Sequence, residues 1–291
     1  MYLLAQFIMA GRFKAALVAL FGNLLPLISP AAVGLVALRR SAGDAMLVML
    51  WALLPLIVLL NMSDVITEVN VVMIWASLAS VVVVLAAALV LRSSASWPWA
   101  LMAVVLSSAA ASLALKFFLG IELEAMRTAL LVMFEQVAEQ QGQVIDLSFS
   151  DLFLAGLVAW AVALTAIGAL LLARWWQALL YNPGGFRTEF HAVRMDRVVA
   201  ASLMAGLCVC YLLSGDFFAW GNLLGLPLLL GGIALVHHTV AFTQLSGHWL
   251  ILFYMGLVLL VGPLSTVLVG LGFLDSMLNI RARLAARKTG N

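Results

Sequence analysis

The sequence predicts an all-α fold, a polytopic membrane helix bundle. Apolar residues make up 65% of the 291 residues and charged residues only 10%, whereas a soluble domain carries about 25% charged residues. Several apolar runs are long enough to cross a bilayer. Within lipid every backbone N–H and C=O must be paired internally, and continuous runs of this kind favour helices over the alternating strands of a barrel. We expect a single integral membrane domain, 1–291, with about eight spans, plus or minus one.

The first apolar block, residues 1–38, is interrupted by Pro26 and Pro30. A proline inside a helix removes a backbone hydrogen bond and bends or breaks the helix. Two short helices joined by a break are therefore one interpretation, and a kinked first span is the other. Ala15 and Ala19 form a small-xxx-small pair, which predicts a helix-docking face. Asn23, beside the break, is a candidate polar group of a cavity.

Later apolar runs predict the remaining spans. The last block, 248–280, is too long for one ordinary span at about 1.5 Å per residue, and Gly262-Pro263 predicts a broken or kinked helix in its middle. The other expected spans are 44–60, 71–91, 100–119, 152–173, 198–214 and 218–242.

The connection 120–147 is acidic. Five Asp and Glu residues stand against a single basic residue, Arg127, which gives a net charge of −4. Its apolar residues recur at helical spacing from Leu123 to Val137, so an amphipathic helix is expected. Such a helix lies on the membrane or bundle surface, or forms a lid over a cavity.

The segment 174–197 is the longest internal stretch that is both aromatic and basic. Its sequence Asn182-Pro183-Gly184-Gly185 predicts a turn. Its arginines are suited to anionic lipid headgroups, a phosphorylated ligand or an acidic partner; the alternative is a topology determinant with an aromatic belt. The candidate ligand or partner residues are Arg174, Trp175, Trp176, Tyr181, Asn182, Arg187 and His191.

The distribution of basic residues predicts the orientation of the chain. By the positive-inside rule, Arg39, Arg40, Arg92 and 174–197 are cytoplasmic, and the acidic connection 120–147 is extracytoplasmic. The basic C-terminal tail is cytoplasmic only if the last block crosses twice as a bent pair, or if one segment is re-entrant. Arg12 joins Arg39 on one side only if 15–38 enter and return, or if the first helix begins near Leu3 and Arg12 faces the bundle.

Few other residues carry recognisable chemistry. Lys116 is expected either to snorkel to the interface or to meet a buried ion partner. Asp275 and Arg281 are expected to form an interface ion pair. The further candidate cavity groups are Asn222, His237 and His238.

No catalytic constellation is recognisable in the sequence. The chain has no CxxC, HExxH or P-loop motif, so we expect no metal, no cofactor and no enzyme activity. A net charge of +2 gives no indication of nucleic acid binding.

Three stretches, ARWWQALLYNPGGFRTEFHAVRMDR, LVALRR and GFLDSMLNIRAR, resemble the YybS-like family of uncharacterised bacterial membrane proteins. That family is remotely similar to the S components of energy-coupling factor transporters. The resemblance implies a multi-pass protein of the bacterial inner (cytoplasmic) membrane. It also implies a small-residue helix that docks on a transporter coupling subunit, and a vitamin-like solute held in an outward-facing cavity.

Two functions are therefore compatible with the sequence. The first is a small-molecule transporter or solute-binding membrane subunit, which should have a cavity that reaches the midplane and carries a few polar groups. The second is a non-transporting scaffold that docks another membrane protein through 174–197 and the basic tail. A scaffold should have a filled bundle and an exposed aromatic-basic patch.

Overall fold

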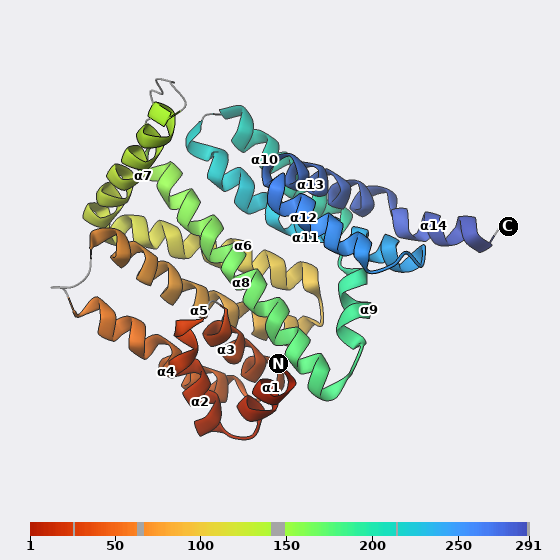
Figure 1. The fold of residues 1–291 in the computed structure, drawn as a ribbon, viewed down its shortest axis with the longest axis horizontal. Helices are drawn as coiled ribbons and strands as arrows, with labels where there is room; N and C mark the ends of the chain where they lie inside the picture. The colour runs from red at the N-terminus through yellow and green to blue at the C-terminus, as the bar shows by residue number, and fades with distance from the viewer. Residues whose placement is uncertain (26, 63–66, 141–148, 214, 290–291) are drawn as a thin grey trace.

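The computed structural model describes residues 1–25, 27–62, 67–140, 149–213 and 215–289, and every regular element in these ranges is helical. Figure 1 shows α8 running between the helices of the N-terminal part and those of the C-terminal part. The all-α prediction is confirmed. The helices are α1 (Tyr2–Met9), α2 (Arg12–Phe21), η1 (Gly22–Leu24), α3 (Ile28–Arg39), α4 (Ala42–Leu60), α5 (Glu68–Ser94), α6 (Trp97–Phe118), α7 (Gly120–Gln140), α8 (Asp151–Tyr181), α9 (Gly185–Ala192), α10 (Arg197–Leu213), η2 (Gly215–Phe217), α11 (Phe218–Phe242), α12 (His248–Leu259), α13 (Val261–Leu278) and α14 (Ile280–Thr289).

The helix lengths fit a multi-pass membrane protein. Among the described residues six helices are long and apolar enough to cross a membrane, and seven if α9 and α10, bent by 63°, count as one span. Because α9 carries Arg187, Glu189 and His191, we assign this crossing to the 17-residue α10 alone. Seven falls within the expected range of eight plus or minus one. Two further apolar helices, α3 and α12, have only 12 residues each and are not included in this count.

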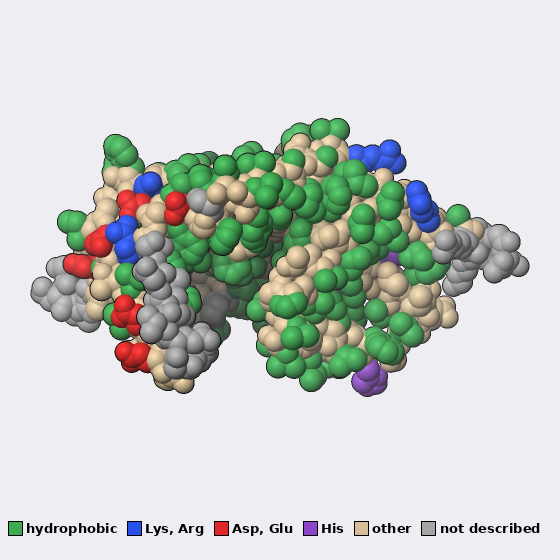
Figure 2. Space-filling model, turned by 90° about the horizontal axis from the view of Figure 1, so that it is seen from above, with side chains coloured by type: hydrophobic (Ala, Val, Ile, Leu, Met, Phe, Trp, Pro, Cys, Tyr) green, Lys and Arg blue, Asp and Glu red, His purple; other side chains and the backbone are tan. Residues whose placement is uncertain are grey.

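On the face that Figure 2 shows, acidic side chains gather at one end, together with a few basic ones, and the other end carries basic side chains without acidic ones. We call these the acidic end and the basic end. At the basic end Arg12 pairs with Asp44 at 2.6 Å, and Arg40 donates to the Met9 carbonyl at 2.6 Å. Arg92 at the end of α5 donates to two carbonyls near the end of α3. At the acidic end Glu68 begins α5 beside α7. The basic groups predicted to share one side of the membrane therefore lie at one end of the molecule.

The first apolar block forms a re-entrant hairpin. Since Arg12 and Arg39 both lie at the basic end, α2 enters the bundle and α3 returns to the same end. The break lies between Phe21 and Ile28, which confirms a broken helix; Pro30 is in the first turn of α3, and Pro26 lies outside the described residues. At about 1.5 Å per residue the two arms are roughly 15 and 18 Å long, about half a hydrocarbon core.

The tip of this hairpin is held by side chains. Ser29 donates its hydroxyl to the Ala19 carbonyl at 2.7 Å, and Asn23 donates its amide to the Ala52 carbonyl of α4 at 2.9 Å. Residues 29–38 of α3 are all buried. The broken backbone is thus covered by protein, as a non-helical segment at membrane depth must be.

The C-terminal block also bends and returns. α12 starts beyond α11 at the basic end, the chain breaks at Leu260, and α13 leads back to Arg281, which contacts the carbonyls of His191 and Val193. Pro263 lies in the first turn of α13, so the expected break is confirmed. The start of the tail therefore lies on the same side as 174–197.

Helices α11 and α13 cross at two glycines. Both helices run toward the basic end. A Cβ added to Gly232 would overlap the Leu268 carbonyl, and one added to Gly272 would overlap the Leu228 carbonyl. Each helix thus places a glycine four residues after the leucine whose carbonyl faces the other helix. Small residues of this kind allow membrane helices to approach backbone to backbone.

We predict that Gly272→Ala destabilises the protein, whereas Gly270→Ala does not. The new methyl group at position 272 must push α11 and α13 apart, with an expected cost of about 1–3 kcal/mol. Gly270 lies in the same helix, but nothing is within 4 Å of a Cβ added there. The free energy of unfolding in mixed micelles, measured by SDS titration, checks this. Equal effects of the two substitutions would contradict the close crossing.

Candidate functional site

A cavity lies under α7 at the acidic end, between α5 and α8. Its volume is about 470 Å³. Along α5 it extends from Val69 to Ser80, which is roughly 17 Å of helix and more than half of a hydrocarbon core of about 30 Å. We call this space the α7 cavity. It is lined by Val69, Val72, Met73, Ala76, Ser77, Ser80, Met126, Ala129, Leu130, Met133, Leu157, Val158, Ala161, Val162 and Thr165.

The α7 cavity is apolar except for three hydroxyls. Ser77 donates to Met73 O at 2.9 Å, and Ser80 donates to Ser77 O at 2.8 Å. On the opposite wall Thr165 donates to Ala161 O at 2.9 Å. Each donor is used within its own helix, but each hydroxyl oxygen keeps lone pairs that can accept a hydrogen bond. The lining is therefore suited to a mostly apolar molecule that carries a few donor groups.

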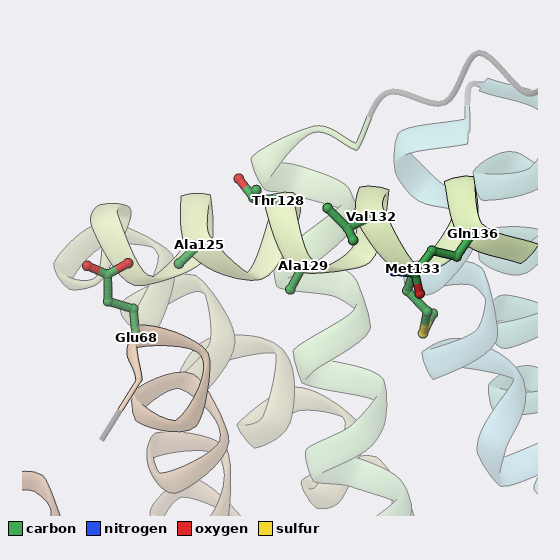
Figure 3. Close-up of a pocket in the computed structure, with 7 residues that line it drawn as sticks. All are labelled: Glu68, Ala125, Thr128, Ala129, Val132, Met133 and Gln136. Atoms are coloured by element: carbon green, nitrogen blue, oxygen red, sulfur yellow. The ribbon is translucent and has the colours of Figure 1, made fainter. Parts of the chain in front are cut away.

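Helix α7 forms the roof of this cavity. Figure 3 shows α7 passing across the ends of α5 and α8, with Glu68 of α5 below its first half; a second, open depression of about 600 Å³ lies between them. A helix is confirmed over 120–140, and 141–147 lie outside the described residues. Its buried residues are Leu123 and Ala138, whereas Met133 and Val137 are exposed.

One arginine fastens α7 to the neighbouring helix. Arg127 pairs with Glu124 within α7 and with Asp151 at the start of α8. About half of the Asp151 side chain and more than half of the Glu124 side chain are exposed. Solvent-exposed ion pairs of this type contribute about 0–1 kcal/mol. These ion pairs therefore orient α7 but contribute little to the free energy that holds it in place.

Another pocket, at the basic end of the molecule, brings together four of the residues predicted from the sequence: Trp175, Arg187, His191 and His237. We call it the aromatic-histidine pocket; its volume is about 490 Å³. His237 Nε2 lies 2.7 Å from the Tyr254 hydroxyl. The pocket is lined by Leu171, Leu172, Trp175, Phe186, Arg187, Phe190, His191, His237 and Tyr254.

Burial is the main cause of a lowered pKa at His191. Burial, then Arg187, and then His237 and His238 lower the pKa of His191 from 6.5 to about 4. The rings of His191 and His238 are 6.3 Å apart between centroids. Among the residues that the structure describes, no group of three or more His, Cys, Asp or Glu side chains could hold a metal ion.

Other residues of 174–197 have structural contacts. Tyr181 lies under the Arg39 guanidinium, 4.1 Å from the ring centroid, and Arg174 pairs with Glu189. Trp176 is fully buried, so its ring packs against protein and is not exposed as a residue of an aromatic belt would be. Asn182 accepts a hydrogen bond from Gly185 N at 2.9 Å across the predicted turn. Gly184 there has φ +87°, a conformation that favours glycine.

Several candidates outside this segment do not line a cavity. Ala15 and Ala19 are buried within the chain, because α2 packs on α3 and α4. Their small-residue face is thus occupied and cannot dock a separate subunit in this conformation. Asn222 is exposed and accepts from the Tyr211 hydroxyl at 2.6 Å. Lys116 is half-buried in the last turn of α6, and within the described chain its ammonium group has no ion pair.

The sequence did not predict the three hydroxyls of the α7 cavity or the burial of the Asp275–Arg281 pair. Ser77 and Ser80 are three residues apart in α5, a spacing that puts them on one face of that helix. This spacing is visible in the sequence, whereas the position of Thr165 opposite them is not. The expected pair of Asp275 and Arg281 forms, at 3.0 Å, but it is buried, with Asp275 only 1% exposed. Its burial depends on α9 and α11, which the local sequence does not indicate.

Comparison with known proteins found no matching family model, no matching curated protein and no matching solved structure. The resemblance to the YybS-like family therefore stays a prediction.

We predict that Arg281→Ala lowers stability by about 3 kcal/mol, because breaking a buried ion pair leaves the remaining charge uncompensated. Arg281 also donates to Val193 O at 2.8 Å and to the His191 carbonyl. The exposed Arg283→Ala is the matched control. A double-mutant cycle with Asp275→Asn, measured by SDS titration, should give strong coupling. Additive effects would contradict a direct pair.

Proposed function

We propose that this chain is a membrane component for the binding or transport of a small, mostly apolar, vitamin-like solute, and that the solute binds in the α7 cavity. The observation that carries this proposal is the cavity itself, which reaches midplane depth and has three hydroxyls on otherwise apolar walls. Ligand sites typically combine an apolar lining with a few polar groups. A filled bundle, as expected of a pure scaffold, would lack such a space.

The roof supports the same proposal. Helix α7 contributes four residues to the cavity lining, Met126, Ala129, Leu130 and Met133. It is tied to α8 by one partly exposed ion pair, Arg127–Asp151, so that displacing it costs little electrostatic energy. A lid of this kind can admit a solute from the acidic end, which the positive-inside rule places outside the cytoplasm.

We predict that Ala76→Trp abolishes solute retention and that Val82→Trp preserves it. Both residues are in α5, but Ala76 lines the α7 cavity, whereas Val82 is 48% exposed on the lipid-facing surface. Native mass spectrometry of the detergent-purified protein, followed by small-molecule extraction, measures what each variant carries. Wild-type protein should carry a stoichiometric metabolite. A wild type that carries only lipid, or a metabolite retained by Ala76→Trp, would contradict the proposal.

A docking role is the second candidate, because α9 has no buried residue and Arg187 is exposed. The partner would be another membrane protein, such as a transporter coupling subunit. Replacing Trp176 would not test this role, since its buried ring supports the fold. Arg187→Ala combined with Trp175→Ala removes exposed and half-buried side chains instead. These changes should abolish co-purification of a docked partner, and unchanged co-purification would count against docking through this segment.

A further inference from the structure

A third pocket lies at the basic end and is separate from the α7 cavity. Its volume is about 470 Å³, and it lies where α5 ends and α6 begins, against α8 and the chain that follows α9. Three arginines and one acidic residue line it: Arg92, Arg174, Arg194 and Glu189. The formal charge of its lining is therefore +2. An excess of positive charge in a concave space favours an anion.

The three arginines differ in how their guanidinium groups are used. Arg92 donates to the Ala37 carbonyl at 3.2 Å and to the Arg40 carbonyl, and Arg174 pairs with Glu189. Arg194, in contrast, has no ion pair or hydrogen bond of its side chain within the described ranges. Its guanidinium is half-buried and remains available to a ligand.

Arg194 also lies close to another cation. Burial lowers the pKa of the Arg281 guanidinium, Asp275 raises it, and Arg194 lowers it again. The last effect is repulsion between two like charges. An anion beside Arg194 would reduce this repulsion, so that the local electrostatics and the pocket lining favour the same kind of ligand.

The start of α6 supplies hydrogen-bond donors to this pocket. Ser96, Trp97 and Pro98 line it, the Ser96 side chain makes no capping hydrogen bond, and the first turn holds no acidic residue. The positive end of the helix dipole is therefore uncompensated by a side chain. Helix N-termini bind phosphate groups through backbone N–H groups. Here Pro98 has no N–H, and the Ser96 N–H donates to Ser94 Oγ at 3.2 Å, which leaves the Trp97 N–H as the backbone donor among these three residues.

A buried donor gives a second, independent indication of a ligand. Trp97 is 6% exposed, and its indole Nε1 has no hydrogen-bond partner among the described residues. An unpaired buried N–H is costly. Trp97 itself lines the pocket, so a ligand oxygen bound there is a candidate partner for this donor.

We propose that this pocket binds a phosphate group, and that Arg194 and Trp97 are its principal side-chain donors. The phosphate belongs either to the headgroup of an anionic phospholipid or to free inorganic phosphate. The pocket lies at the level of the basic residues that begin and end the spans, where headgroups lie. This inference does not depend on the solute proposed for the α7 cavity.

The test uses the full chain in phosphatidylcholine nanodiscs. One arm adds a minor fraction of phosphatidylglycerol, and the other adds sodium phosphate, each against potassium chloride at equal ionic strength. Thermal unfolding is followed by tryptophan fluorescence. Wild-type protein should unfold at a higher temperature in one arm. Stabilisation by phosphatidylglycerol identifies a headgroup, and stabilisation by phosphate alone identifies the free anion.

Variants distinguish this pocket from general surface attraction. Arg194→Gln should weaken binding at least about tenfold, since a hydrogen bond to a charged group is lost. Trp97→Phe, which keeps the ring without the donor, should weaken it less. The exposed Arg197→Gln is the matched control and should bind as wild type does. The proposal is overturned if neither arm stabilises wild type, or if Arg194→Gln and Arg197→Gln behave alike.

Discussion

The structure depends on covering the broken backbone of the first hairpin. Between Phe21 and Ile28 the chain leaves the α-helix inside an apolar bundle, where unpaired N–H and C=O groups would be costly. The Asn23 and Ser29 side chains donate to carbonyls in the last turns of α2 and meet part of this demand. Helices α2, α4, α5 and α8 pack around α3. Because these four helices all pack on the 12-residue helix α3, α3 sets the arrangement of the N-terminal part.

The two ends of the molecule offer different chemistry. At the acidic end the roofed cavity is apolar, with hydroxyls as its polar groups. At the basic end the pockets contain arginines, aromatic rings and histidines. Because α12–α13 and α2–α3 both return to the basic end, the C-termini of α3 and α13 present carbonyl acceptors there, and the N-termini of α2 and α12 present N–H donors. A neutral solute and an anion would therefore each find a suitable environment at opposite ends.

Much of the fold could be predicted from the sequence, because lipid imposes local rules on length and polarity. The expected spans 44–60 and 218–242 match α4 and α11 within two residues. Residue-level placement was less predictable. The segment 174–181 continues α8, and Trp176 is buried. From the sequence alone Trp176 is indistinguishable from a tryptophan at the membrane interface, because its burial depends on helices that are distant in sequence. Likewise the hydroxyls of the α7 cavity become a site only when α5, α7 and α8 meet.

Helix α8 is one unbroken helix of 31 residues. It contributes Leu157 and Thr165 to the α7 cavity, Trp175 to the aromatic-histidine pocket, and Arg174 to the arginine-lined pocket. Its two halves thus line pockets toward the acidic end and the basic end of the molecule. Because α8 is one continuous helix, a tilt that widens the pocket near one end also changes the shape of the pockets near the other end. Occupancy of the two ends would then be linked without any additional moving part.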